Sequence, residues 1–394
     1  MTNTVLAREL HTATAIIPHP VITVDDDGII LEIVSDKAAC RDEETILTPT
    51  FLDIHIHGAA GHDLMRESPA EIARVQGFLA HHGVGHYLPT TVTAPVDDVL
   101  RSLEALADAI ELPAQLNQAK PVGIHLEGPF LSHEKRGVHT ECDLRPPTIE
   151  LFERLQQAAR GHIRLVTLSP ETPGALDLIA HCKQAGVRTS MGHTNATSAQ
   201  AEAAIAAGAS SATHTFNAMR PIDHRESGVL GTVLTTDELY AELICDGVHV
   251  GPEAVRLFHR AKGTERAILV TDGTSATGMG DGHYKLGNMD VVVTGSRCLL
   301  AGTETLAGSV LTLDQAVRNY SGFTGLHFAK AALLASRNPA RMLDLNDGIG
   351  TVSVGHPASF NRYDAQGNLL ATYFSSRSTV AAQTATQRAL PLQS

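Results

Sequence analysis

FLDIHIHGAAGHD, residues 51–63, is the stretch that decides the fold. Side chains two apart in a β-strand point to the same face, so His55 and His57 project together and Asp53 joins them. Imidazole is the commonest metal-binding side chain, and a neighbouring carboxylate can orient such a ring. The stretch therefore predicts a buried strand that presents two histidines at its end, where a glycine turns the chain. Two surface histidines beside a loop would fit the same letters, so the pair needs partners elsewhere.

Short apolar strands alternate with helical stretches from residue 49 onward. Eight stretches predict strands: TFLDIHIH, GHYLPTT, PVGIHLEG, IRLVTLSP, VRTSMGH, SSATHTF, YAELICDG and RAILVTDG. Between them, stretches such as SPAEIARVQGFLAHHG and NATSAQAEAAIAAGA begin near a capping residue and end near a glycine, as helices do. Eight strands alternating with helices predict an α/β fold, a (β/α)8 TIM-like barrel over 49–344.

The two ends of the chain have a different rhythm. Residues 1–48 contain short strands around the turn DDDG, and the sequence after about residue 345 returns to strands and turns. Because these β-rich ends flank the barrel, we expect 1–48 and 345–394 to pair into one small β-sandwich domain.

Composition limits the classes of partner. The chain has 394 residues and a net charge of −13, which argues against nucleic acid or an acidic membrane as a partner. An anionic substrate would need a local cluster of cations. The five cysteines are scattered without a C-x-x-C pair, so neither a disulfide framework nor a thiolate zinc site is indicated. The start of the sequence lacks the pattern of a secretory leader, and no apolar run is long enough for a membrane span, so we expect a cytoplasmic protein.

Four more metal-compatible side chains follow predicted strands. Glu127 ends GIHLE, and the other three, which also stand just past apolar runs, are His193, His214 and Asp272. Strand ends on one face of a (β/α)8 barrel build its active site. Each residue alone could be a helix cap or a satisfied buried polar group, but six at successive strand ends predict a metal-dependent active site.

The motifs also carry a resemblance. DIHIHG, HLEGPFL, GHTNA, HTFNAM and TDGTSATG, in this order, resemble the amidohydrolase superfamily. Within it they are similar to the N-acetylglucosamine-6-phosphate deacetylase family, over nearly the whole chain. The resemblance implies hydrolysis of the N-acetyl group of N-acetyl-D-glucosamine 6-phosphate to give D-glucosamine 6-phosphate and acetate.

The resemblance also implies roles for the residues at the strand ends. Glu127, His193 and His214 would form the principal metal site. Some members lack the two N-terminal histidines and use one metal, whereas this chain has both. His55 and His57, bridged by Glu127, would therefore hold a second divalent ion. Nitrogen and oxygen ligands without thiolate favour zinc here and leave iron, cobalt or manganese open.

Catalysis and substrate binding are implied in the same way. Asp272 would take a proton from water and return it to the leaving nitrogen, and His139 would stabilise the oxyanion. Substrate contacts are implied at Val138, His139, Asn217, Ala218, Arg225, His249, Leu306, Ala307 and Gly308. Arg225 and His249 would select the phosphate, with the arginine reached from a neighbouring subunit. The expected active unit is therefore a homodimer, with a tetramer left open.

Two departures and two alternatives remain. Thr50 stands where the family has glycine, and GHPASF replaces the usual Ala-Asp near the end, both away from the chemistry. Another amidohydrolase, such as a cyclic amidase or a deaminase, is the first alternative, although those often use a modified lysine where this chain has Glu127. A sugar-phosphate-binding regulator without catalysis is the second.

Cys142, in a segment that could be a mobile lid, is expected to be an inert thiol, and a redox role is left open.

Overall fold

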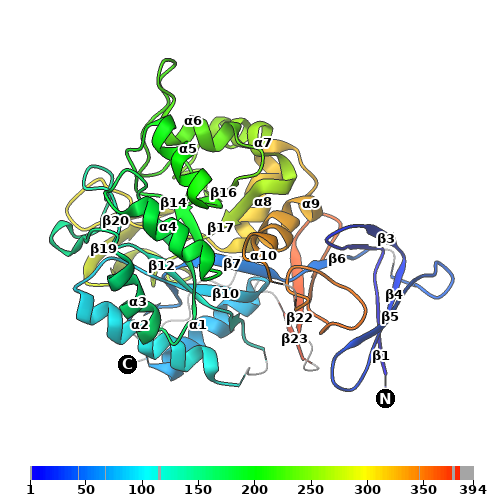
Figure 1. Cartoon of the computed structure of the whole chain (residues 1–394). Coiled ribbons are helices and arrows are strands. Elements are labelled where there is room, and N and C mark those ends of the chain that lie inside the picture. Colours follow the sequence, from blue (N-terminus) through cyan, green and yellow to red (C-terminus); the bar gives the residue numbers. More distant parts are fainter. Residues whose placement is uncertain are drawn as a thin grey trace.

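The structure is a computed structural model that describes residues 2–42, 44–66, 68–113, 117–345, 347–374 and 378–381. Its centre is a parallel barrel whose strands appear in the order of the sequence (Figure 1). The strands are β7 (Phe51–Ile56), β10 (Val84–Thr91), β12 (Ile124–Glu127), β13 (Ile163–Leu168), β14 (Arg188–Met191), β15 (Ser211–Ala212), β16 (Tyr240–Ile244) and β17 (Ala267–Val270). All eight predicted strands are present.

The last strand closes the barrel against the first. Ile56 bridges Gly273 in parallel register, and the His57 backbone N–H donates to the Gly273 carbonyl at 2.8 Å. Every residue of β7 is buried, which is typical of a parallel strand covered on both faces. Beyond it, a side chain on Gly58 would place its Cβ 2.3 Å from the His62 carbonyl oxygen. Glycine is therefore needed where the strand turns into the small hairpin of β8 (Gly58–Ala59) and β9 (His62–Asp63).

A helix follows each barrel strand. The helices are α1 (Pro69–His81), α2 (Val96–Glu111), α3 (Ile149–Ala158), α4 (Ala175–Gln184), α5 (Ser198–Ala207), α6 (Gly228–Thr235), α7 (Pro252–Arg266) and α8 (Leu313–Thr324). In α5, Thr197 and Gln200 form a capping box, and Gly208 ends the helix. Two shorter helices follow α8: α9 (Phe328–Ala332), which contacts α8, and α10 (Arg337–Met342), which contacts β7 and β17. The predicted fold class is confirmed.

The ends of the chain form two further sheets. One contains β1 (Asn3–Leu6), β4 (Pro20–Val24) and β5 (Ile30–Ser35). The other runs in the order β23 (Ser378–Ala381), β22 (Leu369–Phe374), β21 (Phe360–Tyr363), β6 (Ile46–Pro49), β2 (Glu9–His11) and β3 (Ile16–Pro18). Figure 1 shows β22 and β6 between the barrel and the N-terminal strands. An apolar cluster that includes Leu10, Ile22 and Phe360 joins the two sheets. The domain boundaries at 48/49 and 344/345 stay a prediction.

A three-stranded antiparallel sheet interrupts the pattern after β17. It consists of β18 (Gly282–Leu286), β19 (Met289–Thr294) and β20 (Arg297–Leu300). Leu286 packs in one apolar cluster with Ala307 and Val92. The sheet therefore forms an apolar wall beside the carboxyl ends of the barrel strands.

Candidate metal centre and active site

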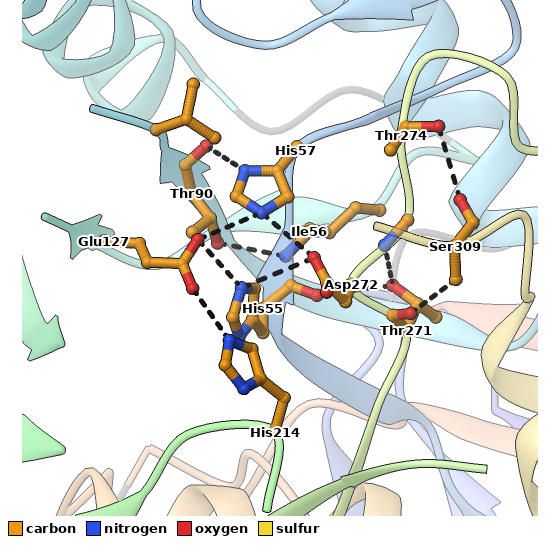
Figure 2. A network of polar contacts seen from close by, with 12 residues as sticks. His55, Ile56, His57, Thr90, Glu127, His214, Thr271, Asp272, Thr274 and Ser309 are labelled. Atoms are coloured by element: carbon orange, nitrogen blue, oxygen red, sulfur yellow. Dashed lines mark hydrogen bonds and ion pairs between the residues drawn. The ribbon is translucent and has the colours of Figure 1, made fainter. Parts of the chain in front are cut away.

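The side chains predicted at the strand ends meet at one point. His55 lies in β7 and His57 directly follows it, whereas Glu127 is the last residue of β12. His214 and Asp272 each lie two residues beyond a strand, after β15 and β17. Figure 2 shows these five side chains pointing toward one another. The mouth of the barrel thus carries a compact cluster of imidazoles and carboxylates.

Glu127 stands between two groups of histidines. Its Oε2 lies 3.4 Å from His55 Nε2 and 3.3 Å from His57 Nε2. Its Oε1 lies 3.3 Å from His193 Nε2 and 3.2 Å from His214 Nε2. The two oxygens of one carboxylate therefore address two neighbouring positions, as a bridging ligand would.

Asp272 completes the group that contains the two N-terminal histidines. Its Oδ1 lies 3.0 Å from His57 Nε2 and 3.6 Å from His55 Nε2. Ligand atoms of these three residues lie within 4.8 Å of one another, and so do those of Glu127, His139 and His193. Burial alone would raise the pKa of Asp272, but the charges of His55 and His57 hold that pKa well below its usual range. The carboxylate is therefore ionised where it meets the cluster.

The hydrogen bonds behind the imidazoles show that a cation fits here. His57 Nδ1 lies 3.1 Å from the Thr90 carbonyl oxygen, and His193 Nδ1 lies 2.9 Å from that of Lys135. A carbonyl oxygen only accepts, so each Nδ1 carries the proton of the neutral ring and each Nε2 presents a lone pair. Each of these nitrogen lone pairs faces an oxygen of Glu127. A nitrogen lone pair and a carboxylate oxygen repel each other unless a cation lies between them.

Without a metal ion, protons take the place of that cation. Burial alone would lower the pKa of His57, but Asp272 and Glu127 outweigh it and raise that pKa to about 9. The buried His55 Nε2 has no hydrogen-bond partner among the described residues. The donor set of imidazoles and carboxylates suits a divalent ion such as zinc.

The strand ends hold three of these residues in unusual backbone conformations. His193, His214 and Asp272 have φ values of 46°, 29° and 50°. Non-glycine residues seldom adopt positive φ, and such strain, of order 1–3 kcal/mol each, gathers at functional sites. The barrel therefore maintains these side-chain directions at a cost in stability.

A cavity of about 330 Å³ opens onto the cluster. Most of the predicted site residues line it: His57, Glu127, Val138, His139, His193, His214, Asn217, Ala218, His249, Asp272, Leu306 and Gly308. Gly308 has a φ of 58°, and a Cβ there would lie 2.8 Å from the Asp272 carbonyl oxygen. Only glycine lets this loop approach Asp272 so closely.

Three predicted residues lie outside this lining. His55 is fully buried behind the cluster, and Ala307 is buried in the apolar wall. Arg225 is exposed on the loop before α6, where its backbone N–H donates to Asp223. Arg225 therefore does not line the cavity of its own copy, and its predicted phosphate contact stays a prediction.

The protonation of His139 follows from its neighbour Thr93. The Thr93 backbone N–H donates to His139 Nδ1 at 3.2 Å, and the Thr93 hydroxyl lies 2.8 Å from the same atom. Nδ1 therefore holds a lone pair, and Nε2 carries the proton of the neutral ring. Burial lowers the pKa of His139 to about 3, so the ring stays neutral. His139 is thus a hydrogen-bond donor toward the cavity rather than a metal ligand.

Sequence reasoning missed the partners that orient two of these histidines. Glu242 Oε2 lies 3.1 Å from His55 Nδ1, and Asp246 Oδ2 lies 2.7 Å from His249 Nδ1. Asp53, which shares the strand face of His55, instead accepts from the Thr271 hydroxyl at 2.6 Å. The sequence contains one indication of these partners: Glu242 is a glutamate inside the otherwise apolar strand AELIC.

Fold and site together define a metal-dependent hydrolase built on a (β/α)8 barrel. The chain belongs to the amidohydrolase family, whose profile matches residues 46–384. No described helix has both the length and the apolar character needed to cross a membrane.

Relatives with assigned activities cover most of the chain. N-acetylglucosamine-6-phosphate deacetylase of Bacillus subtilis (strain 168) is 40% identical over 319 residues, which are 80% of this chain and 80% of that protein. N-acetylgalactosamine-6-phosphate deacetylase of Escherichia coli O157:H7 is 36% identical over 93% of this chain and 96% of its own length.

Solved structures agree with the sequence relatives. A mutant N-acetyl-D-glucosamine-6-phosphate deacetylase from Mycobacterium smegmatis, in complex with N-acetyl-D-glucosamine-6-phosphate, superimposes with a TM-score of 0.90. It is 33% identical, and the match covers 97% of this chain and 100% of that one. The enzyme from Thermotoga maritima gives a TM-score of 0.86 at 30% identity, covering 97% of this chain and 100% of its own.

Proposed function

We propose that this chain hydrolyses the N-acetyl group of N-acetyl-D-glucosamine 6-phosphate to give D-glucosamine 6-phosphate and acetate. The observation that carries the proposal is Glu127, which places one oxygen on each of two histidine pairs at the floor of the cavity. The relatives at 36–40% identity, which are named as deacetylases of amino-sugar 6-phosphates, support the choice of substrate.

The metal ligands of the proposal fall into two sets. Glu127, His193 and His214 would hold the essential ion, and His55 and His57 a second one that shares Glu127. When bound, such an ion polarises the amide carbonyl and makes water a nucleophile at neutral pH. Zinc is the proposed metal, because the ligands are imidazole nitrogens and carboxylate oxygens at positions that leave room for substrate.

Asp272 and His139 divide the remaining chemistry. The ionised carboxylate of Asp272 accepts a proton from the attacking water and returns it to the nitrogen, since an amine leaves far more easily when protonated. The Nε2–H of His139 donates to the carbonyl oxygen as negative charge develops there. His139 can serve as this donor over a wide pH range, because its low pKa keeps the ring neutral.

Substrate binding uses the rest of the cavity. Gly308 approaches Asp272 and Leu306 lines the same cavity, where they would surround the acetyl group. Asn217 and His249 line the same cavity and would contact the sugar and its phosphate. Arg225 would reach the phosphate from a second subunit, which makes a homodimer part of the proposal.

The proposed compartment is the cytoplasm. The five cysteines are all free, and four of them are buried. Free thiols suit a reducing compartment. Cys142 is exposed in a short turn at Glu141–Asp143, without a second cysteine to pair with.

The galacto epimer is a second candidate substrate. The relative that acts on N-acetylgalactosamine 6-phosphate covers 93% of this chain, more than the Bacillus subtilis enzyme does. The two sugars differ only at one hydroxyl, whereas the amide and phosphate are the same. Selectivity between them therefore depends on the contacts around that hydroxyl.

The function is tested by following free amine release from a panel of substrates. We expect turnover of N-acetyl-D-glucosamine 6-phosphate, a lower kcat/KM on its galacto epimer and a poor rate on unphosphorylated N-acetyl-D-glucosamine. Dihydroorotate, a cyclic amide, should not react. Preference for the galacto epimer would correct the substrate, and turnover of dihydroorotate alone would overturn the proposed function.

A further inference from the structure

Glu242 lies inside the barrel, behind the cluster of imidazoles and carboxylates at the strand ends. Its side chain is 0% exposed, and its Oε2 accepts from His55 Nδ1 at 3.1 Å. The same oxygen accepts the backbone N–H of His214 at 3.2 Å. One carboxylate thus contacts a histidine from each of the two proposed metal positions.

The contact with His55 differs from the contacts of the other cluster histidines. His57 and His193 donate from Nδ1 to backbone carbonyls. His214 Nδ1 has no hydrogen-bond partner among the described residues. Of these four rings, His55 is the one whose Nδ1 contacts a carboxylate in the described part of the chain.

This contact determines what His55 can do. Glu242 Oε2 already accepts the His214 backbone N–H, so we assign it as an acceptor for the His55 ring as well, which fixes the proton on Nδ1 and leaves a lone pair on Nε2. That Nε2 is buried without a hydrogen-bond partner and points between Glu127 Oε2 and Asp272 Oδ1, at 3.4 and 3.6 Å. A carboxylate behind a ligating imidazole also makes the ring a better ligand.

Asp53 does not take over this task. In the described part of the chain it bonds the Thr271 hydroxyl and the backbone N–H groups of His55 and Thr271, and no imidazole ring. Loss of Glu242 would therefore leave the His55 ring free to change its tautomer.

We propose that Glu242 is a positioning residue that determines whether the His55–His57 position holds a metal ion. The inference rests on the proposed metal-dependent function. The second ion binds because Glu242 prepares His55 for it, and the affinity of the position formed by Glu127, His193 and His214 depends far less on Glu242.

The test counts zinc ions on the full-length protein. Chelator-stripped protein is titrated with Zn²⁺ against a chromophoric chelator, which yields the number of equivalents and the affinity of each. We expect two equivalents in the parent protein. Glu242→Gln keeps the shape and an acceptor oxygen, so it should weaken the second equivalent by about 10–100-fold. Glu242→Leu removes the acceptor, so this variant should bind one zinc equivalent.

Two control variants replace other carboxyl groups near this strand. Asp53→Asn replaces a neighbouring buried carboxyl group while keeping an oxygen that can accept the backbone N–H groups of His55 and Thr271, and Glu238→Gln replaces an exposed glutamate before the same strand. Both should bind zinc as the parent does. His55→Ala should lose the second equivalent, and adding Glu242→Gln to it should change nothing further, because both changes act on one position.

Several results would overturn the proposal. The first is that the parent binds one zinc equivalent. The second is that Glu242→Gln and Glu242→Leu bind both ions with parental affinity. The third is that both equivalents are weakened equally, which would indicate that Glu242 supports the barrel in general. If the leucine variant fails to fold, the glutamine variant decides. Because zinc counting needs no substrate, a protein without deacetylase activity would refute the proposed function and leave this measurement intact.

Discussion

A hydrogen bond to one nitrogen of an imidazole determines what the other nitrogen can do. His57 donates from Nδ1 to Thr90, so its Nε2 presents a lone pair. His139 accepts at Nδ1 from Thr93, so its Nε2 is a donor. The sequence predicted where both rings would stand, but their tautomers depend on backbone groups 33 and 46 residues away. Such contacts leave no local pattern.

Asp272 is the residue whose replacement should affect catalysis most specifically. Asp272→Asn keeps the shape of the side chain but cannot accept a proton. We expect kcat to fall by roughly 10²–10⁴-fold, the scale of general acid–base groups, with KM nearly unchanged. Steady-state kinetics at matched zinc content checks this. A variant within a few-fold of the parent would remove Asp272 from the mechanism.

The two N-terminal histidines should be less critical than the other ligands. Replacing His55 and His57 together by alanine should cost at most one zinc equivalent and leave partial activity. His193→Ala should abolish tight zinc binding and turnover, because His193 belongs to the essential position. Metal analysis of each purified variant, alongside its rate, distinguishes the two positions. Complete loss of metal in the double variant would contradict the division.

The strands could be predicted because their signal is local. Each barrel strand is a short apolar run, and the ends of parallel strands meet at one face, so residues such as Glu127 and His214 could be grouped without coordinates. Glu242 could not, because an apolar strand such as AELIC indicates only burial. Its partner His55 lies 187 residues away in the sequence.

One hydrogen bond joins the first and last helices of the barrel. His82, at the end of α1, lies 3.0 Å from Asp314 in α8, and Arg318 lies 3.3 Å from the same carboxylate. Burial alone would raise the pKa of Asp314, but His82 and Arg318 lower it below its usual value. The contact therefore closes the ring of helices through a buried ionised carboxylate.

The stability of this closure should depend on pH. Since the folded pKa is lowered, the unfolded state binds the proton more readily, and the carboxylate stabilises the fold above the unfolded pKa. That contribution is lost as the pH falls through the folded value. Asp314→Asn should cost about 1.5–3 kcal/mol of unfolding free energy at neutral pH, and the difference from the parent should shrink below about pH 5. Urea unfolding at several pH values measures it, and a constant difference would refute the assignment.

At the scale of the whole molecule, Arg225 tests whether one subunit completes another. A hydrogen bond to a charged group is worth about 1.5–3 kcal/mol, or roughly 10–150-fold. Arg225→Ala should reduce kcat/KM for N-acetyl-D-glucosamine 6-phosphate by about that factor. The poor rate on the unphosphorylated sugar should barely change. Equal losses on both substrates would mean that Arg225 supports the fold or the dimer instead.

Mixed dimers separate the two subunits directly. Co-expressed Arg225→Ala and Asp272→Asn chains should form mixed dimers in which one site has an intact Asp272 and an intact arginine from its partner. Random pairing would restore about a quarter of the parent rate, since half of the dimers are mixed and one site of each is intact. Activity no higher than that of the separate variants would place the arginine in its own subunit.

The exposed position of Arg225 was implied by the family resemblance and not by the local sequence. A guanidinium in HRESG suits a phosphate equally well from either subunit. The folded chain places this loop on the surface, away from the cavity lining of the same copy.

The central claim is that the metal ion of the strand-end cluster is required for deacetylation. Removing and restoring that metal tests it most directly. Acetate release from N-acetyl-D-glucosamine 6-phosphate is measured on chelator-stripped protein during a titration with Zn²⁺. The stripped protein should release no more acetate than Asp272→Asn, and activity should return in proportion to the first equivalent bound. Undiminished acetate release by protein shown to be metal-free would contradict the account.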